Sequence, residues 1–222
     1  MKRHSLTYGK GREMIRSGEF IPASGSFKYA HWETTHLKSM LLGMSSHIID
    51  LALSFFGKPV SVTSIKHQSE RAISLSVTLQ FESGKWAHLW LDASQPRIQE
   101  HVEISGSMDG KNALLTFDNV DHMELHRQTH PSRGIDVLAP TLADIAPAFN
   151  LADIQRWRPD YALPNCGQTR HFIQGFAGEV REFCDAVIDK REPYPSMDDV
   201  INTMRVIDAI SKNPDGATQL VE

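Results

Sequence analysis

The side chains in this sequence that are best suited to chemistry are histidines, which transfer protons near neutral pH and bind metals. His31, His36 and His47 lie close together in the chain. Their spacing matches no standard zinc signature, and no cysteine joins them. The sequence therefore predicts no metal site, and a cofactor-independent isomerase or hydrolase built on the histidines is one hypothesis.

Motifs for nucleophilic catalysis and for phosphate binding are missing. Cys166 and Cys184 have no triad-like neighbours, and the sequence contains neither a G-x-S-x-G elbow nor a P-loop. The one G-x-G, at residues 9–11, has Met14 in place of the third glycine of a dinucleotide fingerprint and follows no predicted strand. We therefore expect this chain alone not to hold NAD or NADP in the usual way.

Length and composition indicate one ordinary domain. The 222 residues are 41% hydrophobic and 23% charged, which is enough for a single hydrophobic core. A net charge of −4 with scattered Lys and Arg argues against a nucleic-acid partner. The most apolar stretch, Ile48–Phe56, is far shorter than a membrane span and contains Asp50, so no membrane partner is expected. Two cysteines and no signal-like start favour a cytoplasmic location.

Apolar residues at helical spacing predict helices over residues 8–17, 44–56, 169–190 and 197–211. In the third helix the repeat consists of Phe172, Phe176, Val180, Phe183 and Val187. Cys184 is expected near the core face of that helix. Ser196 is the predicted N-cap of the fourth helix, because two aspartates follow in the first turn.

Alternating residues predict the strands of an antiparallel sheet, with connections of hairpin length. The predicted strands cover residues 25–32, 60–67, 72–82, 85–92, 97–105, 112–117 and 120–127. Residues 129–167 contain four prolines and predict an irregular excursion with one short helix. A short strand can follow Pro214.

One face of the central predicted strands is neutral and aromatic. It carries Ser76, Thr78, Trp86, His88 and Trp90. A solvated face usually carries Lys and Glu, so this composition favours packing against another surface. An exposed amphipathic face is the alternative.

Five segments in order resemble the C-terminal domain of the glucose–fructose oxidoreductase / inositol dehydrogenase (Gfo/Idh/MocA) family. They are the linker helix at 8–20, the histidine helix at 43–59, the strand–SG–strand hairpin at 80–91, the G-x-x-G turn at 104–115 and the closing helix pair at 179–210. The resemblance implies an α+β fold with a large open, mostly antiparallel sheet and helices packed on one face. Residues 1–222 would form this single domain, with residues 1–20 as the linker helix.

The resemblance also implies a function. The domain would be the substrate-binding and oligomerisation half of an NAD(P)-dependent oxidoreductase that acts on a sugar-like or cyclitol hydroxyl. The open sheet face would form a homo-oligomer, either a dimer or a tetramer. A separate Rossmann domain would hold the NAD or NADP and supply the lysine that assists proton transfer.

By the same resemblance, His47 is the candidate general base that takes the hydroxyl proton while hydride leaves for the nicotinamide. Family members commonly carry an acidic or polar residue four positions earlier, where this chain has Gly43. Asp50 is expected to cap the helix or pair locally. The predicted substrate contacts are Tyr161, Asn165, Arg170 and His171.

Two alternatives stay open at this point. The segment with the predicted substrate contacts can equally be a solvated loop. The whole chain can be a stand-alone, non-catalytic module that dimerises or binds a small polyol, a reading that Gly43 and the missing dinucleotide site favour.

Overall fold

The computed structural model describes residues 1–31, 34–128, 152–158 and 171–220. Within these ranges the chain forms one large sheet with the strand order β8-β7-β6-β5-β1-β4-β3-β2-β9. The strands are β1 (Ile21–Ala30), β2 (Pro59–Gln68), β3 (Ile73–Phe81), β4 (Trp86–Asp92), β5 (Gln99–Met108), β6 (Lys111–Asp118), β7 (His122–Gln128), β8 (Ala152–Trp157) and β9 (Gly216–Gln219).

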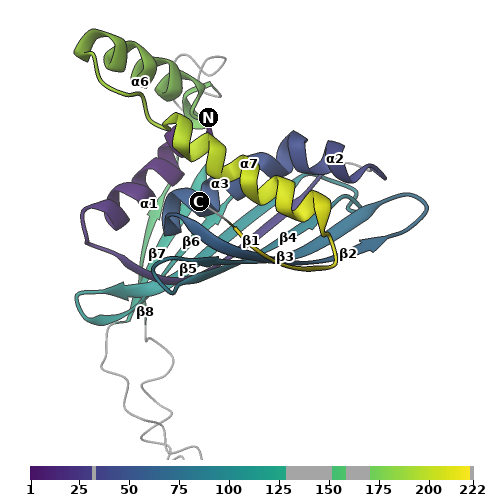
Figure 1. The fold of residues 1–222 in the computed structure, drawn as a ribbon. Coiled ribbons are helices and arrows are strands. Elements are labelled where there is room, and N and C mark those ends of the chain that lie inside the picture. The colour runs from purple at the N-terminus through teal and green to yellow at the C-terminus, as the bar shows by residue number, and fades with distance from the viewer. Residues whose placement is uncertain (32–33, 129–151, 159–170, 221–222) are drawn as a thin grey trace, which may run out of the picture.

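The sheet is antiparallel except at its centre, where β1 runs parallel to β4. Helices lie on one side of it, and the other face stays open (Figure 1). They are the short η1 (Lys2–His4), α1 (Leu6–Arg16), α2 (Leu37–Met40), η2 (Leu41–Ser45), α3 (Ser46–Phe56), α6 (Phe176–Asp189) and α7 (Met197–Lys212). This architecture confirms the predicted α+β class with an open, mostly antiparallel sheet.

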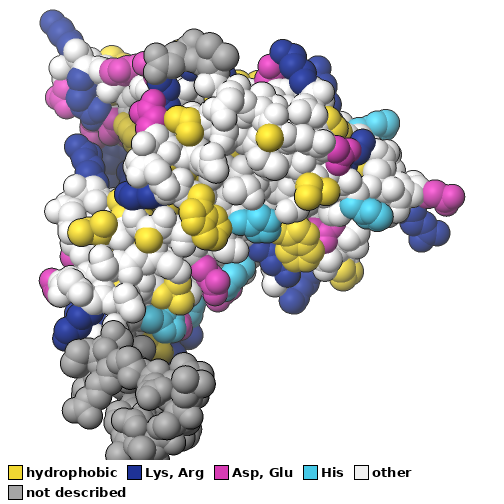
Figure 2. Space-filling view, turned by 60° about the horizontal axis from the view of Figure 1, so that its bottom comes forward, with side chains coloured by type: hydrophobic (Ala, Val, Ile, Leu, Met, Phe, Trp, Pro, Cys, Tyr) yellow, Lys and Arg dark blue, Asp and Glu magenta, His cyan; other side chains and the backbone are white. Residues whose placement is uncertain are grey.

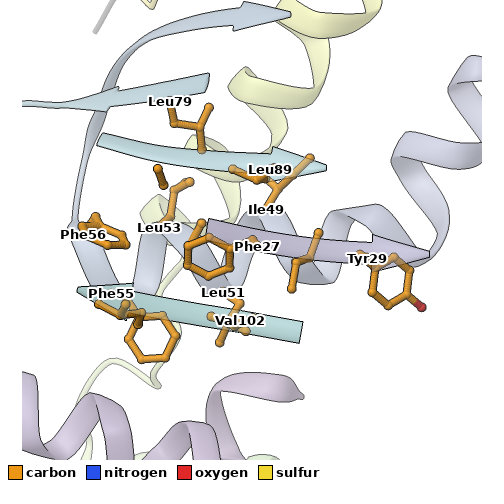
Figure 3. Close-up of a cluster of buried hydrophobic side chains, with 14 of the residues drawn as sticks. Phe27, Tyr29, Ile49, Leu51, Leu53, Phe55, Phe56, Leu79, Leu89 and Val102 are labelled. Carbon is orange, nitrogen blue, oxygen red and sulfur yellow. The ribbon is translucent and has the colours of Figure 1, made fainter. Parts of the chain in front are cut away.

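The core forms where α3 packs on the central strands. Side chains of α3 lie among Phe27, Leu79, Leu89 and Val102 of the sheet (Figure 3). Phe56 of α3 stacks on Phe81 with 5.3 Å between the ring centroids. Because α3 is buried along most of its length, its first turn is held firmly against the sheet.

Three elements differ from the sequence-based expectation. The helix expected from residue 44 begins at Ser46 as α3, and it follows η2, in which Gly43 has non-helical angles (φ −77°, ψ −125°). The segment Ala152–Trp157, in the expected irregular excursion, is the edge strand β8 paired with β7. The remainder of that excursion lies outside the described residues.

The third predicted helix is shorter than expected and packs differently. Gly175, with φ of 92°, separates α6 from the turn before it. Cys184 is exposed, so the expectation that it lies near a core face was wrong. The physical reason is that α6 projects from the body, so the body of the domain does not cover its apolar residues (Figure 1).

No single helix in the described ranges is long and apolar enough to cross a membrane. The segments Leu37–Gly43 and Ser46–Phe56, bent by 51° relative to each other, meet the requirements of length and composition only as a pair.

Candidate functional site

His47 lies in the first turn of α3, directly after the break at Gly43. Its side chain borders a cavity of about 470 Å³ between the end of β1 and the α2–α3 connection. The described residues that line this cavity are His31, Thr34, Ser39, Leu42, Gly43, Ser46 and His47. The site thus combines two imidazoles with three hydroxyl groups, and none of these side chains carries a fixed charge.

The imidazole of His47 is suited to accept a proton. Burial lowers its pKa below 6.5, and the ammonium groups of Lys2 and of the N-terminus lower it further. The Asp50 and Glu179 carboxylates oppose this effect without reversing it. The ring of His47 makes no hydrogen bond within the described part of the chain. A neutral, unoccupied imidazole at neutral pH can act as a general base.

The end of β1 brings a second histidine to the cavity. The buried His31 follows Phe27 and Tyr29 at alternate positions, and its backbone N–H donates to the Asp92 carbonyl at 3.0 Å. Tyr29 lies beside it, with 5.9 Å between the ring centroids. Among the described residues the buried Tyr29 hydroxyl has no hydrogen-bond partner, and burial raises the pKa of this phenol to about 12.

The N-terminal segment anchors α3 through Arg3. Arg3, which is 1% exposed, donates from Nε and Nη2 to the two carboxylate oxygens of Asp50, at 2.9 and 2.8 Å. Its Nη1 donates to Asp199 of α7 at 2.8 Å. Burial alone would lower the pKa of Arg3, but the carboxylates outweigh it and raise that pKa. Asp50 therefore pairs with a distant residue, and the expectation of local pairing was wrong.

A second buried ion pair lies next to the first. Lys2 pairs with Glu100 of β5, and the Tyr8 hydroxyl donates to the same carboxylate. The Lys2 ammonium also lies 4.9 Å from the centroid of the Tyr29 ring. Burial lowers the pKa of Lys2. The two pairs place the residues before α1 between α3, β5 and α7.

Of the predicted substrate contacts, Tyr161, Asn165 and Arg170 lie outside the described residues. His171 is exposed in the helical stretch 171–173 before α6, and its ring contacts Phe176 with 6.0 Å between centroids. It is not among the described residues that line the His47 cavity. The substrate role of all four residues therefore stays a prediction.

The described part of the chain contains no group of three side chains able to hold a metal ion. The G-x-G at residues 9–11 lies inside α1 with no strand before it. A Cβ on Gly11 would lie 2.6 Å from the Phe117 ring, so this glycine lets α1 pack closely on β6. This G-x-G therefore does not fit the phosphate group of a dinucleotide.

The open face of the sheet is a second candidate surface. All five residues predicted to line an interface lie on it, on β3 and β4, at the positions that alternate with the buried ones. Ser76 Oγ lies 3.0 Å from His88 Nε2, and the Lys28 ammonium lies 4.4 Å from the Trp90 ring centroid. Figure 2 shows hydrophobic and histidine side chains gathered on this face.

Sequence reasoning missed the role of His31, Tyr29 and Lys2 around the cavity. From the sequence, His31 stood out only as a metal ligand, which its spacing did not support, and as one of the histidines of the isomerase or hydrolase hypothesis. The signal that could have placed it is its position in the alternation of Phe27, Tyr29 and His31, which puts its side chain on the same side of β1 as the core. No local sequence pattern identifies the role of Lys2, because its partner Glu100 is 98 residues away.

Residues 17–215 match the profile of the oxidoreductase family's C-terminal alpha/beta domain, known as Gfo/Idh/MocA. No curated protein matches the chain in sequence. Among solved structures, a dehydrogenase from Chromobacterium violaceum is 20% identical with a TM-score of 0.76, and the match covers 95% of this chain and 58% of that one.

Two further solved structures share the fold. Levoglucosan dehydrogenase in complex with NADH and L-sorbose is 12% identical with a TM-score of 0.73, with 100% of this chain and 64% of that chain covered. An NAD binding oxidoreductase from Klebsiella pneumoniae is 12% identical with a TM-score of 0.71, with 100% and 65% covered. The chain thus spans less than two thirds of these structures. Because the family profile covers most of the sequence, the chain belongs to the Gfo/Idh/MocA oxidoreductase family and forms its C-terminal alpha/beta domain.

Proposed function

We propose that this domain supplies the substrate half of an NAD(P)-dependent oxidoreductase that acts on a sugar-like or cyclitol hydroxyl, with His47 as the general base. The observation that carries the proposal is the position of His47 in a cavity lined by uncharged polar side chains. The volume of about 470 Å³ is within the usual range for small-molecule sites. Levoglucosan dehydrogenase, which shares the fold, was solved with NADH and L-sorbose.

In this role, His47 accepts the proton of the substrate hydroxyl on its free ring nitrogen. The lowered pKa keeps the imidazole neutral at neutral pH, which is the form that can accept a proton. Because the G-x-G at residues 9–11 lies inside α1, we assign hydride acceptance to a second domain. The contribution of this chain is proton transfer and substrate positioning.

The lining residues also favour a neutral substrate. Thr34, Ser39 and Ser46 can donate and accept hydrogen bonds, as a polyhydroxylated ligand requires. None of the described lining residues is Lys or Arg, the side chains that recognise phosphate or carboxylate. A neutral sugar or cyclitol therefore fits this cavity better than a sugar phosphate does.

The test is an NMR titration of the histidine rings with myo-inositol and L-sorbose, and with glucose 6-phosphate as the charged comparison. We expect the neutral polyols to shift the His47 and His31 resonances and to leave His88, on the open sheet face, unchanged. His47→Gln should retain binding with a weaker shift at His31. Equal shifts with the phosphorylated sugar, or no shifts at all, would refute the proposed site.

The alternative is a stand-alone, non-catalytic module that binds a polyol at the same cavity. Gly43 favours it, because the position four residues before His47 offers no side chain to relay a proton. An assay of the chain joined to a dinucleotide-binding domain distinguishes the two functions. Polyol binding without NADH formation would support the non-catalytic module, and NADH formation that His47→Gln abolishes would support the enzyme.

The open sheet face is our proposed homo-oligomer interface. Its support is the combination of Ser76, Thr78 and His88 with two tryptophans, of which Trp86 is 50% exposed. Exposed tryptophan on a largely neutral face is typical of surfaces that pack against a partner. The cytoplasmic location stays a prediction.

A further inference from the structure

A second cavity, of about 850 Å³, lies between α1, the end of α3 and the connection from α6 to α7. These elements are on the helical side of the sheet (Figure 1). Among the described residues that line it are three arginines, Arg12, Arg16 and Arg191. We call it the arginine cavity. It shares no described lining residue with the His47 cavity, whose lining carries no fixed charge, so the two cavities are suited to different ligands.

Two of the three arginines have no carboxylate partner in the described part of the chain. Arg12 and Arg16 are four residues apart on α1, so their side chains lie on one face of that helix. Neither makes a hydrogen bond or ion pair with a described residue, and the Nη1 atom of Arg12 is buried without an acceptor. Like charges at this spacing repel each other. An anion in the cavity would therefore relieve a repulsion that the described residues leave in place.

Tyr194 fixes the position of the Arg12 guanidinium. The Tyr194 ring centroid lies 4.3 Å from Arg12 Cζ. The Tyr194 hydroxyl accepts from Arg3 at 3.0 Å, and its backbone N–H donates to Glu182 at 3.0 Å, so the ring is held at both ends. Stacking on an aromatic ring uses the face of a guanidinium and not its N–H groups, which lie in its plane. Arg12 is thus a positioned cation with unused hydrogen-bonding capacity.

The charge of the lining is positive overall. Arg191 pairs with Glu182 at 2.5 Å, which leaves the charges of Arg12 and Arg16 uncompensated. Burial and the charge of Arg12 lower the pKa of His4, another lining residue, so its imidazole is neutral at neutral pH. The C-terminal end of α3 contributes only about half a negative charge. An anion with two negative charges therefore matches this cavity better than a singly charged one does.

The remaining wall of the cavity includes apolar residues. Ile15 precedes Arg16 on α1, and Phe55 and Phe56 are the last two residues of α3. The volume of about 850 Å³ is near the upper end of the usual range for small-molecule sites and far exceeds what a bare phosphate ion requires. A ligand that fills the cavity therefore needs an apolar or aromatic part in addition to its anionic group.

We propose that the arginine cavity binds a small organic phosphate, a phosphate monoester whose other group is apolar or aromatic. Guanidinium N–H groups match the oxygens of a phosphate in geometry, and a monoester carries about 1.5 to 2 negative charges near pH 7. Arg12 and Arg16 would bind the phosphate, and the wall that contains Ile15 would contact the organic group. This site is separate from the His47 cavity and does not depend on the proposed function.

The probe for the test is phenyl phosphate, and calorimetric titration at constant ionic strength gives its dissociation constant. Phenol and benzoate carry the same ring with no charge and with one negative charge. We expect phenyl phosphate to bind at least about tenfold more tightly than benzoate, and phenol to bind more weakly still. In an NMR titration of the histidine rings, phenyl phosphate should raise the pKa of His4, because it offsets the charge of Arg12. The resonances of His47 and His88 should stay unchanged.

Matched variants locate the binding site. Arg12→Gln and Arg16→Gln each remove one guanidinium and should each weaken binding of phenyl phosphate at least about fivefold. Arg12→Lys should recover part of the loss, because lysine keeps the charge but not the fork of donors. Arg16 is exposed, so its replacement should leave the melting temperature unchanged even if Arg12→Gln disturbs Tyr194. Lys10→Gln removes a charge from the same helix outside the cavity lining and should leave the dissociation constant unchanged.

Three results would overturn the proposal. The first is equal affinity for phenyl phosphate and benzoate. The second is an equal loss of affinity in Lys10→Gln and Arg16→Gln, because it would assign binding to the general charge of α1. The third is inorganic phosphate that binds as tightly as phenyl phosphate, because the organic group would then have no role. Each of these results leaves the proposed function untouched, since none of them involves the His47 cavity.

Discussion

The guanidinium of Arg3 binds both carboxylate oxygens of Asp50, although 47 residues separate the two. Asp50 is three residues after His47 on α3, and the same guanidinium also binds Asp199 at the start of α7. The segment before α1 therefore fixes the helix that carries the candidate base. Two-point attachment of a planar guanidinium restricts orientation as well as distance.

Removing this contact should destabilise the domain. We expect Arg3→Met to lower the free energy of unfolding by about 3 kcal/mol, the lower end for a broken buried pair, because both aspartates keep some exposure to water. Arg3→Lys should lower the free energy of unfolding less, because lysine keeps the charge but not the two-point geometry. Urea denaturation measures both values. The control is Lys10→Met, which removes an exposed pair with Glu13 and should change stability by less than about 0.5 kcal/mol.

The pKa values of two histidines should be shifted in opposite directions from the ordinary value. The pKa of His47 is lowered, chiefly by burial. For His101, burial acts in the same direction, but hydrogen bonds to Asp118 at 2.6 Å and to Glu103 outweigh it and raise the pKa. An NMR pH titration should place His47 below 6.5 and His101 above it. Asp118→Asn should lower the pKa of His101 and leave that of His47 unchanged.

The same shifts set the sign of the pH dependence of stability. Because the unfolded state binds a proton at His47 more readily than the folded state does, the domain should lose stability as pH falls through 6.5. His101 contributes stability that is present below pH 6.5 and is lost as pH rises through its raised pKa. His47→Gln should therefore flatten the acid side of the stability profile, measured by urea denaturation between pH 5 and pH 8. A profile that His47→Gln leaves unchanged would contradict the assignment.

Local patterns were enough to predict much of the fold. The alternation from Ile73 to Phe81 predicted β3 with its inner face, and every apolar residue of that alternation is buried. Ser196 caps α7 as predicted and forms a capping box with Asp199. In both cases the physical cause is a side-chain periodicity or a cap within a few residues of the element it determines.

The parts that sequence reasoning missed depend on distant partners. Periodicity predicts that the α6 helix has an apolar face, but it does not say whether the domain itself covers that face. Arg3 finds Asp50 and Asp199 only once α3 and α7 are packed together. The edge strand β8 pairs on one side only, and its short alternation lies in a proline-rich segment.

A carboxylate at position 43 should raise the pKa of His47. A Cβ on Gly43 would meet no atom within 4 Å, so the cavity has room for a side chain. Gly43→Asp would add a negative charge to the lining of the cavity that His47 also lines. A carboxylate within about 6 Å of an imidazole favours the imidazolium and raises its pKa by about one unit or more. The measurement is the His47 ring titration by NMR. Gly43→Asn is the matched control and should leave the pKa of His47 near the wild-type value. Equal shifts in both variants would mean that a changed shape of the cavity, and not the charge, moves the pKa.

A charge on the open sheet face should break the proposed oligomer. Trp90 lies between β1 and β3 in the register, opposite Lys28 and Ser76. Trp90→Glu would replace the ring that contacts Lys28 with a carboxylate inside the proposed interface, and a charge buried at an interface costs several kcal/mol. Sedimentation velocity should show the wild-type oligomer and a monomeric variant at the same concentration. Glu103→Gln, a substitution on β5, which β1 separates from β4, should keep the wild-type mass. A Trp90→Glu variant with the wild-type mass would contradict the proposed interface.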